Sequence, residues 1–114
     1  MIKYQNEMRL RTREGVRGGN GTIEDLNILE PEEMLGKATL FTRFFLDPGD
    51  SIGWHEHRDD AEIYYVLSGE LTVIQPEGER LLKAGDVAFT ANGEGHSVEN
   101  RSGEKAEMLA VIFA

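Results

Sequence analysis

Turn signals recur about every ten residues through most of the chain, and they constrain the fold more than any other feature. They lie at 47–50, 58–61, 68–69, 76–79, 84–86, 92–95 and 101–104. Proline, glycine, asparagine and aspartate are frequent in them because these residues suit the backbone angles of turns. The segments between are short and rich in apolar residues, as strands are. The pattern predicts an all-β sandwich or barrel over residues 37–114.

Residues 1–36 carry a weaker pattern, and we expect an N-terminal arm that packs on the barrel or on a partner subunit, within a single domain overall. Residues 1–14 alternate weakly, which favours an edge strand with its arginines in solvent; an arm on a partner subunit is the alternative. The glycine-rich segment 15–21 lacks the spacing of a phosphate-binding loop and is expected to be a flexible loop. Residues 22–29 fit a short helix or a strand, and residues 31–34 fit one helical turn.

The chain has three histidines, and two of them, His55 and His57, are separated by one residue. Residues at this spacing share a face on a strand but not on a helix, so the two imidazoles can act together only from a strand. If segment 58–61 closes a hairpin, Glu62 lies opposite His57. Nitrogen and oxygen donors in this arrangement suit a divalent first-row metal. The alternation around the third histidine, His96, allows it to point inward as well.

The two-residue turn at Ser68-Gly69 predicts a second hairpin, in which residues 62–66 lie opposite residues 71–75. Both faces of this hairpin are apolar. The outward face would carry Ile63, Tyr65, Leu67 and Ile74. A monomer would leave these side chains in water, so we expect a homodimer that pairs through this face.

Composition narrows the classes of function. Hydrophobic residues make up 39% and charged residues 29%, which is ordinary for a globular protein. No apolar run approaches the roughly 20 residues of a membrane span, and the N-terminus lacks the apolar core of a signal peptide, so a cytoplasmic protein without membrane association is expected. The absence of cysteine excludes disulfides and thiolate ligands. A net charge of −9 argues against nucleic-acid binding, although a divalent ion would still make one site locally positive and suited to a small anionic ligand.

Two stretches of the chain resemble the conserved motifs of the cupins. The first motif is matched at every position, by Gly49, His55, His57, Glu62 and Gly69. The second is matched by Gly85, Gly93, His96 and Asn100, with Ala91 where the family usually has proline. In this respect the chain is similar to the small single-domain, metal-binding cupins of the oxalate decarboxylase-like, cupin_2 type.

The resemblance implies a double-stranded β-helix, or jelly roll, that holds one divalent metal ion per chain. The implied ligands are His55, His57, Glu62 and His96. Manganese or iron is favoured, while zinc, nickel, cobalt and copper accept the same donors. The residues expected to face the cavity beside the metal are Thr42, Phe44, Leu46, Tyr64, Val66, Val73, Val98, Met108, Ala110 and Ile112.

Four protein ligands leave two positions on an octahedral ion, which suits a bidentate organic acid or a substrate together with dioxygen. We therefore expect an enzyme of decarboxylase or dioxygenase type that binds a small oxygen-chelating acid. The sequence indicates no arginine or acid directed inward for catalysis, which argues against decarboxylation, and no catalytic residue is assigned. A non-catalytic, metal-dependent binding or sensor protein is the alternative. A sugar isomerase or epimerase fits less well, because neither a base nor a phosphate-binding patch is evident.

Overall fold

The computed structural model describes all 114 residues and contains ten strands and three 3₁₀ turns, with no α-helix. The strands are β1 (Arg9–Glu14), β2 (Thr22–Asn27), β3 (Ala38–Leu46), β4 (Ser51–Glu56), β5 (Ala61–Ser68), β6 (Glu70–Gln75), β7 (Gly78–Lys83), β8 (Val87–Thr90), β9 (Gly95–Glu99) and β10 (Ala106–Phe113). The turns are η1 (Gln5–Glu7), η2 (Val16–Gly18) and η3 (Pro31–Met34). No helix is long and apolar enough to cross a lipid bilayer.

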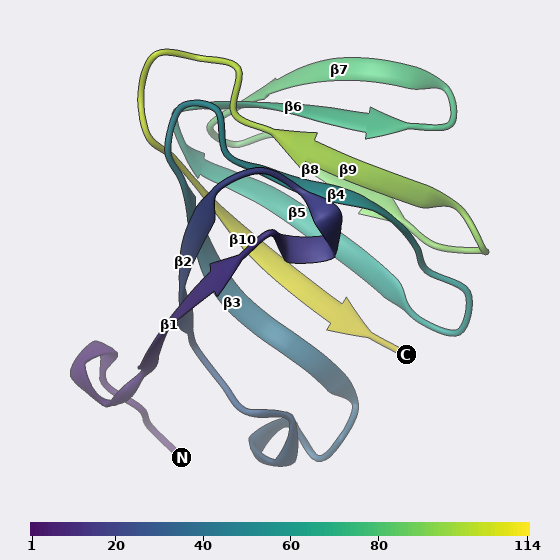
Figure 1. Cartoon of the computed structure of the whole chain (residues 1–114). Coiled ribbons are helices and arrows are strands. Elements are labelled where there is room, and N and C mark those ends of the chain that lie inside the picture. The colour runs from purple at the N-terminus through teal and green to yellow at the C-terminus, as the bar shows by residue number, and fades with distance from the viewer.

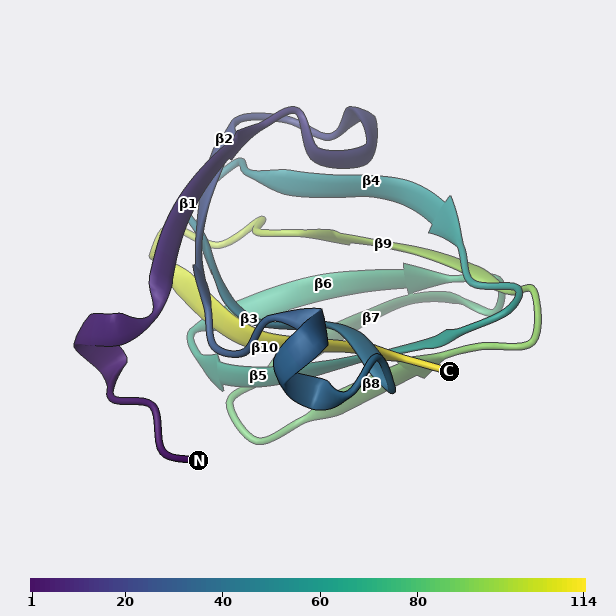
Figure 2. The same cartoon turned by 90° about the horizontal axis from the view of Figure 1, so that it is seen from below.

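The strands form two antiparallel sheets that face each other (Figures 1 and 2). One sheet has six strands in the order β1-β2-β3-β10-β5-β8, and the other has four in the order β4-β9-β6-β7. From β3 onward the chain passes repeatedly from one sheet to the other, and only β6 and β7 are consecutive within a sheet. The predicted all-β jelly roll is confirmed.

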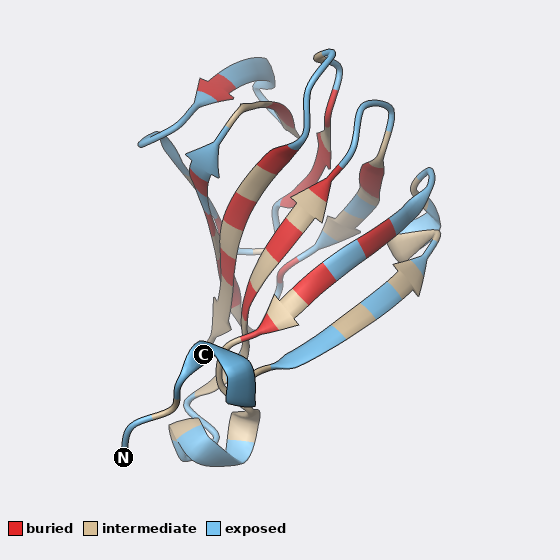
Figure 3. Cartoon of the chain, turned by 90° about the vertical axis from the view of Figure 1, so that its left-hand side faces the viewer, coloured by how far each residue is buried: buried red, intermediate tan, exposed pale blue.

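The hydrophobic core fills the space between the sheets, and burial alternates along the strands that line it (Figure 3). Along β10, Ala106, Met108 and Ala110 are fully buried, and the residues between them are only partly so. This alternation follows from the strand repeat of two residues. The register places Ala110 opposite Thr42 of β3 on one side and opposite Tyr64 of β5 on the other, so one inward row crosses three strands.

Both predicted hairpins of the central region are wrong in their pairing. Strand β4 pairs with β9, whereas β5 pairs with β10 and β8, so His57 and Glu62 approach from opposite sheets. Likewise β5 and β6 lie in different sheets, and Ile74 is therefore not on the face that carries Tyr65. The turn at Gly69 crosses over the start of β10: a Cβ on Gly69 would lie 2.9 Å from the Cα of Ala106. Alternation specifies which side chains face inward, but it leaves the pairing partner open.

Residues 1–36 extend the six-stranded sheet instead of standing apart from it. Strand β1 is its edge and pairs with β2, which pairs with β3. Segment 22–29, which fitted a helix or a strand, contains β2, and the helical turn expected at residues 31–34 is η3. Packing of this segment on a partner subunit stays a prediction.

Candidate metal centre

Three strands from the two sheets bring four ionisable side chains to one point in the interior. In the four-stranded sheet, β4 and β9 pair so that His55 lies directly opposite His96, and His57 follows the end of β4. Glu62 comes from β5 in the facing sheet. The candidate ligand atoms of these four residues all lie within 4.8 Å of one another. His57, Glu62 and His96 are each no more than 3% exposed.

The distances within this cluster suit a single ion. The Oε1 atom of Glu62 lies 2.8 Å from Nε2 of His96, 2.9 Å from Nε2 of His57 and 3.3 Å from Nε2 of His55. Two donors at right angles, each about 2.1 Å from a metal, are roughly 3.0 Å apart. Imidazole nitrogens and a carboxylate oxygen are also a donor set that first-row divalent metals accept. The four side chains therefore form a site fit for one metal ion.

Groups around the cluster direct the Nε2 atoms of His55 and His57 toward Glu62, where a metal ion would bind. The Nδ1 atom of His55 lies 2.8 Å from the carbonyl oxygen of Gly53. The Nδ1 atom of His57 lies 2.7 Å from a carboxylate oxygen of Asp60. Both oxygens can only accept, so these Nδ1 atoms carry the proton. Such outer partners fix the tautomer and orientation of metal-ligating histidines.

The third imidazole, that of His96, is held on two sides by buried groups. Its Nδ1 atom lies 2.8 Å from the hydroxyl of Thr90, which is 1% exposed. The amide of Gln75 donates a hydrogen bond to the same hydroxyl. The ring of Tyr64 stacks on the imidazole with centroids 4.5 Å apart and planes only 2° from parallel. The position of the His96 imidazole is therefore set by the fold before any metal binds.

The electrostatics of the cluster also point to a cation. Burial alone would raise the pKa of Glu62, but hydrogen bonds from the three histidines outweigh it and hold that pKa far below its usual range. The Glu62 carboxylate raises the pKa of His57, against the opposing effect of burial. Burial is the main cause that lowers the pKa of His96. A buried carboxylate surrounded by imidazole nitrogens requires positive charge, which either a proton or a metal ion can supply.

A cavity of about 70 Å³ opens beside the cluster. Its lining residues are Arg13, Val16, Arg17, Leu40, Phe44, Ile52, His55, Glu62, Tyr64 and Ile112. Of the ten cavity residues predicted from the sequence, Phe44, Tyr64 and Ile112 line this cavity. The structure places the other seven in the interior away from it, each no more than 3% exposed: Thr42, Leu46, Val66, Val73, Val98, Met108 and Ala110.

Sequence reasoning missed the two arginines that line the cavity, Arg13 and Arg17. The expectation that the arginines of β1 face solvent is wrong for Arg13, which lies opposite the fully buried Ile23 on the inner side of β2. The glycine-rich segment, expected to be a flexible loop, packs against β4 and supplies Val16 and Arg17 to the cavity. The signal that could have revealed them is Asp25, an inward-facing acid of β2 that requires cationic partners.

Comparison with known proteins agrees with this architecture. The Cupin domain family matches residues 42–112. A curated relative, the "Oxalate-binding protein" of Thermotoga maritima, is 43% identical over 114 residues, which cover 99% of this chain and 93% of the relative. The crystal structure of a predicted oxalate decarboxylase from Thermotoga maritima superposes with a TM-score of 0.93 at 42% identity, covering 99% of this chain and 98% of the other. A crystal structure from Thermus thermophilus gives a TM-score of 0.70 at 30% identity, covering 80% of this chain and 82% of the other. The chain belongs to the cupin family.

Proposed function

We propose that this cupin binds a small oxygen-chelating organic acid, with oxalate as the first candidate, through one manganese or iron ion held by His55, His57, Glu62 and His96. The observation that carries the proposal is the cavity that opens directly onto two of these residues, His55 and Glu62. The name of the Thermotoga maritima relative, an oxalate-binding protein, supports the choice of ligand. A bidentate acid would use the two positions that four protein ligands leave on an octahedral ion.

The other lining residues suit a small acid. Leu40, Phe44, Ile52 and Ile112 give the cavity an apolar lining beside the ionisable cluster. Burial, followed by the nearby Glu62 carboxylate, raises the pKa of Tyr64 well above its usual value. Its phenol therefore keeps its proton and acts as a hydrogen-bond donor, not as a base.

Catalysis is the second part of the proposal, as a decarboxylase or dioxygenase. A bound manganese or iron ion would supply Lewis-acid or redox chemistry. The chain itself contributes Tyr64 as a buried hydrogen-bond donor, together with an apolar lining. The lack of an inward-facing arginine was one argument against decarboxylation. It no longer holds, because Arg13 and Arg17 line the cavity. A non-catalytic binding or sensor function is the alternative, and carbon dioxide release or oxygen uptake with oxalate distinguishes the two.

The first experiment is elemental analysis of protein purified without a metal-affinity tag, beside a His57→Ala variant. About one manganese or iron ion per chain, lost in the variant, is expected. Calorimetric titration of oxalate should then show binding to the metal-loaded protein and none to the metal-free protein. Equal binding of oxalate with and without metal would overturn the proposed mode, and absence of binding to the loaded protein would overturn the choice of ligand.

We also propose that the chain forms a homodimer through the outer face of the six-stranded sheet. Apolar side chains from four adjacent strands gather there: Phe41, Phe45, Ile63, Tyr65, Val87, Phe89, Leu109 and Val111. Val87 is 61% and Phe89 is 55% exposed in the single chain, so pairing would remove them from water. Phe89→Glu should give a monomer in sedimentation, while Leu81→Glu, on the other sheet, should leave the dimer intact. A dimer unchanged by Phe89→Glu would exclude this face.

A further inference from the structure

The segment between β1 and β2 is seated on β4 by contacts between backbones. The Ser51 amide donates to the carbonyl oxygen of Asn20 at 3.0 Å, and the Asn20 amide donates to the Ser51 hydroxyl at 2.8 Å. A Cβ at Gly19 would lie 2.2 Å from the Ser51 carbonyl oxygen, and a Cβ at Gly53 would lie 2.1 Å from the Arg17 carbonyl oxygen. Only glycine allows two backbones to approach this closely. Figures 1 and 2 show η2 beside β4.

This seating holds Arg17 at the cavity. Its backbone adopts the left-handed conformation, with φ 54° and ψ 31°, which non-glycine residues rarely adopt and which is often associated with functional positions. Arg17 lines the cavity together with His55, Glu62 and Tyr64. Arg17 has no acidic partner within the chain, so its guanidinium is available to a ligand.

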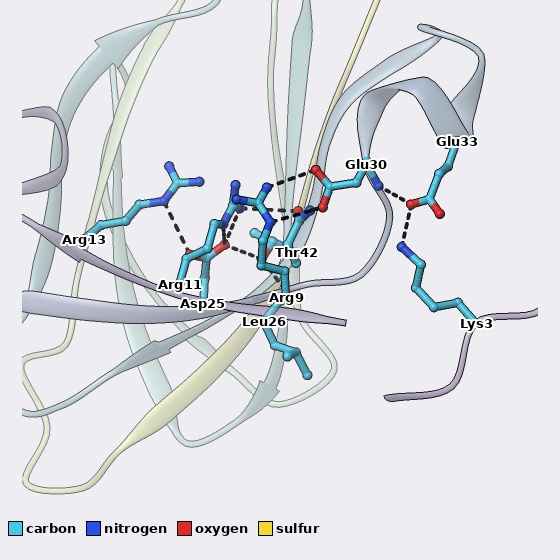
Figure 4. A network of polar contacts seen from close by, with 10 residues as sticks. Lys3, Arg9, Arg11, Arg13, Asp25, Leu26, Glu30, Glu33 and Thr42 are labelled. Atoms are coloured by element: carbon cyan, nitrogen blue, oxygen red, sulfur yellow. Dashed lines mark hydrogen bonds and ion pairs between the residues drawn. The ribbon is translucent and has the colours of Figure 1, made fainter. Parts of the chain in front are cut away.

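The second arginine of the cavity, Arg13, is held in place by a buried acid (Figure 4). Asp25 is fully buried, and its Oδ2 atom accepts hydrogen bonds from Arg11 and from the hydroxyl of Thr42. Its Oδ1 atom makes no hydrogen bond and lies 3.3 Å from Nε of Arg13. One carboxylate thus balances two arginines, which leaves positive charge beside the cavity.

The charge of the cavity is opposite in sign to that of the protein. At the cavity and its support, the three arginines Arg11, Arg13 and Arg17 face the two carboxylates of Asp25 and Glu62. One positive charge is left over, in a chain whose net charge is −9. A divalent ion would add to this surplus. A site with more positive charge than one carboxylate can neutralise favours a dianion over a monoanion of the same size.

We propose that Arg17, assisted by Arg13, is the anion-recognition element of this site and selects small dicarboxylates over monocarboxylates. The inference rests on the proposed function and deepens it, since it names the residues that recognise the charge of the ligand. A guanidinium can donate two parallel hydrogen bonds to a carboxylate, which a lysine ammonium cannot reproduce. The glycine-rich segment is then a part of the binding site, and Gly19 is a positioning residue for Arg17.

The test uses the manganese-loaded full chain and calorimetric titration with oxalate and with glycolate, a two-carbon monoanion. Arg17→Gln should weaken oxalate binding about 10- to 100-fold, as expected for loss of a charge-assisted hydrogen bond, and should lower the ratio of oxalate to glycolate affinity. Arg17→Lys should recover only part of the loss. Arg80→Gln, which removes an exposed arginine without an acidic partner on β7, should change neither affinity. The metal content should remain unchanged in all three variants.

Two outcomes separate this inference from the function on which it rests. If the unmodified loaded protein binds neither acid, the proposed function is overturned. If it binds oxalate and Arg17→Gln binds equally well, or loses both acids by the same factor, the role of Arg17 is overturned and the proposed function stands.

A second pair of variants tests the seating of the segment. Gly19→Ala places a methyl group against the Ser51 carbonyl at a backbone φ of −74°, which alanine readily adopts. It should reduce oxalate affinity as Arg17→Gln does while the metal content is retained. Gly103→Ala, which meets nothing within 4 Å, is the matched control and should behave as the unmodified protein. Full oxalate affinity in Gly19→Ala would show that the backbone contact does not position Arg17.

Discussion

The hydroxyl of Thr90 allows a sharp test of the metal centre. It lies 2.8 Å from Nδ1 of His96, both residues are 1% exposed, and no other side chain hydrogen-bonds to that nitrogen. Thr90→Val keeps the shape of the side chain and removes its hydrogen-bonding atom. His96 then has no partner to keep the proton on Nδ1, so the tautomer that presents Nε2 to a metal loses its preference.

The magnitude follows from two separate considerations. Loss of an outer partner of a metal-ligating histidine typically lowers metal affinity about 10- to 100-fold, or roughly 1.4–2.8 kcal/mol. Leaving a buried donor unpaired costs about 1–3 kcal/mol, which spans the same range. The free energy of unfolding of the metal-free protein should fall less, by about 1 kcal/mol, because the imidazole can change tautomer when no metal is present.

Metal affinity is measured by competition with a chromophoric chelator, and stability by urea unfolding of the metal-free protein. Thr72→Val is the matched control, since Thr72 is a strand threonine, 8% exposed, whose hydroxyl makes no hydrogen bond within the chain. It should leave the affinity within about twofold. If Thr90→Val also binds the metal within about twofold of the unmodified protein, the hydroxyl does not orient His96 and the argument is refuted.

Two further predictions concern pH and folding. Because Glu62 raises the pKa of His57 above its usual 6.5, that imidazole is protonated in the metal-free protein at a higher pH than usual. Metal affinity should therefore begin to fall at a pH above 6.5 and should continue to fall as the solution is made more acidic. An affinity in chelator competition that does not change with pH would contradict the assignment. Asn100→Ala should lower the free energy of unfolding, measured in urea, by about 2–4 kcal/mol, because the buried amide donates hydrogen bonds to the carbonyls of Leu46 and Glu104. Asn6→Ala, at an exposed position, is the control. Equal stability of the two variants would contradict this prediction.

The cluster of four donors could be predicted even though the strand pairing was wrong. Alternation along β4 and β5 specifies that His55 and Glu62 face inward, and that direction is the same for a hairpin as for two strands in facing sheets. In both arrangements the side chains converge on one point. Pairing depends instead on how each turn crosses the barrel, as the approach of Gly69 to β10 illustrates, and such contacts join residues distant in sequence.

The arginines of the cavity could not be placed by the same reasoning, because strand β1 inverts the usual pattern. Its inner side carries Arg11 and Arg13, which meet Asp25 of β2, whereas Leu10 is 60% exposed. Periodicity assigns the apolar side of a strand to the interior, so it predicts the wrong orientation for this strand. The inversion is stable because Asp25 and the arginines satisfy one another's charge beside the cavity and not in the apolar core. A strand whose polar side faces inward thus marks the end of the barrel that holds the cavity, and local rules of patterning are expected to fail at such a candidate site.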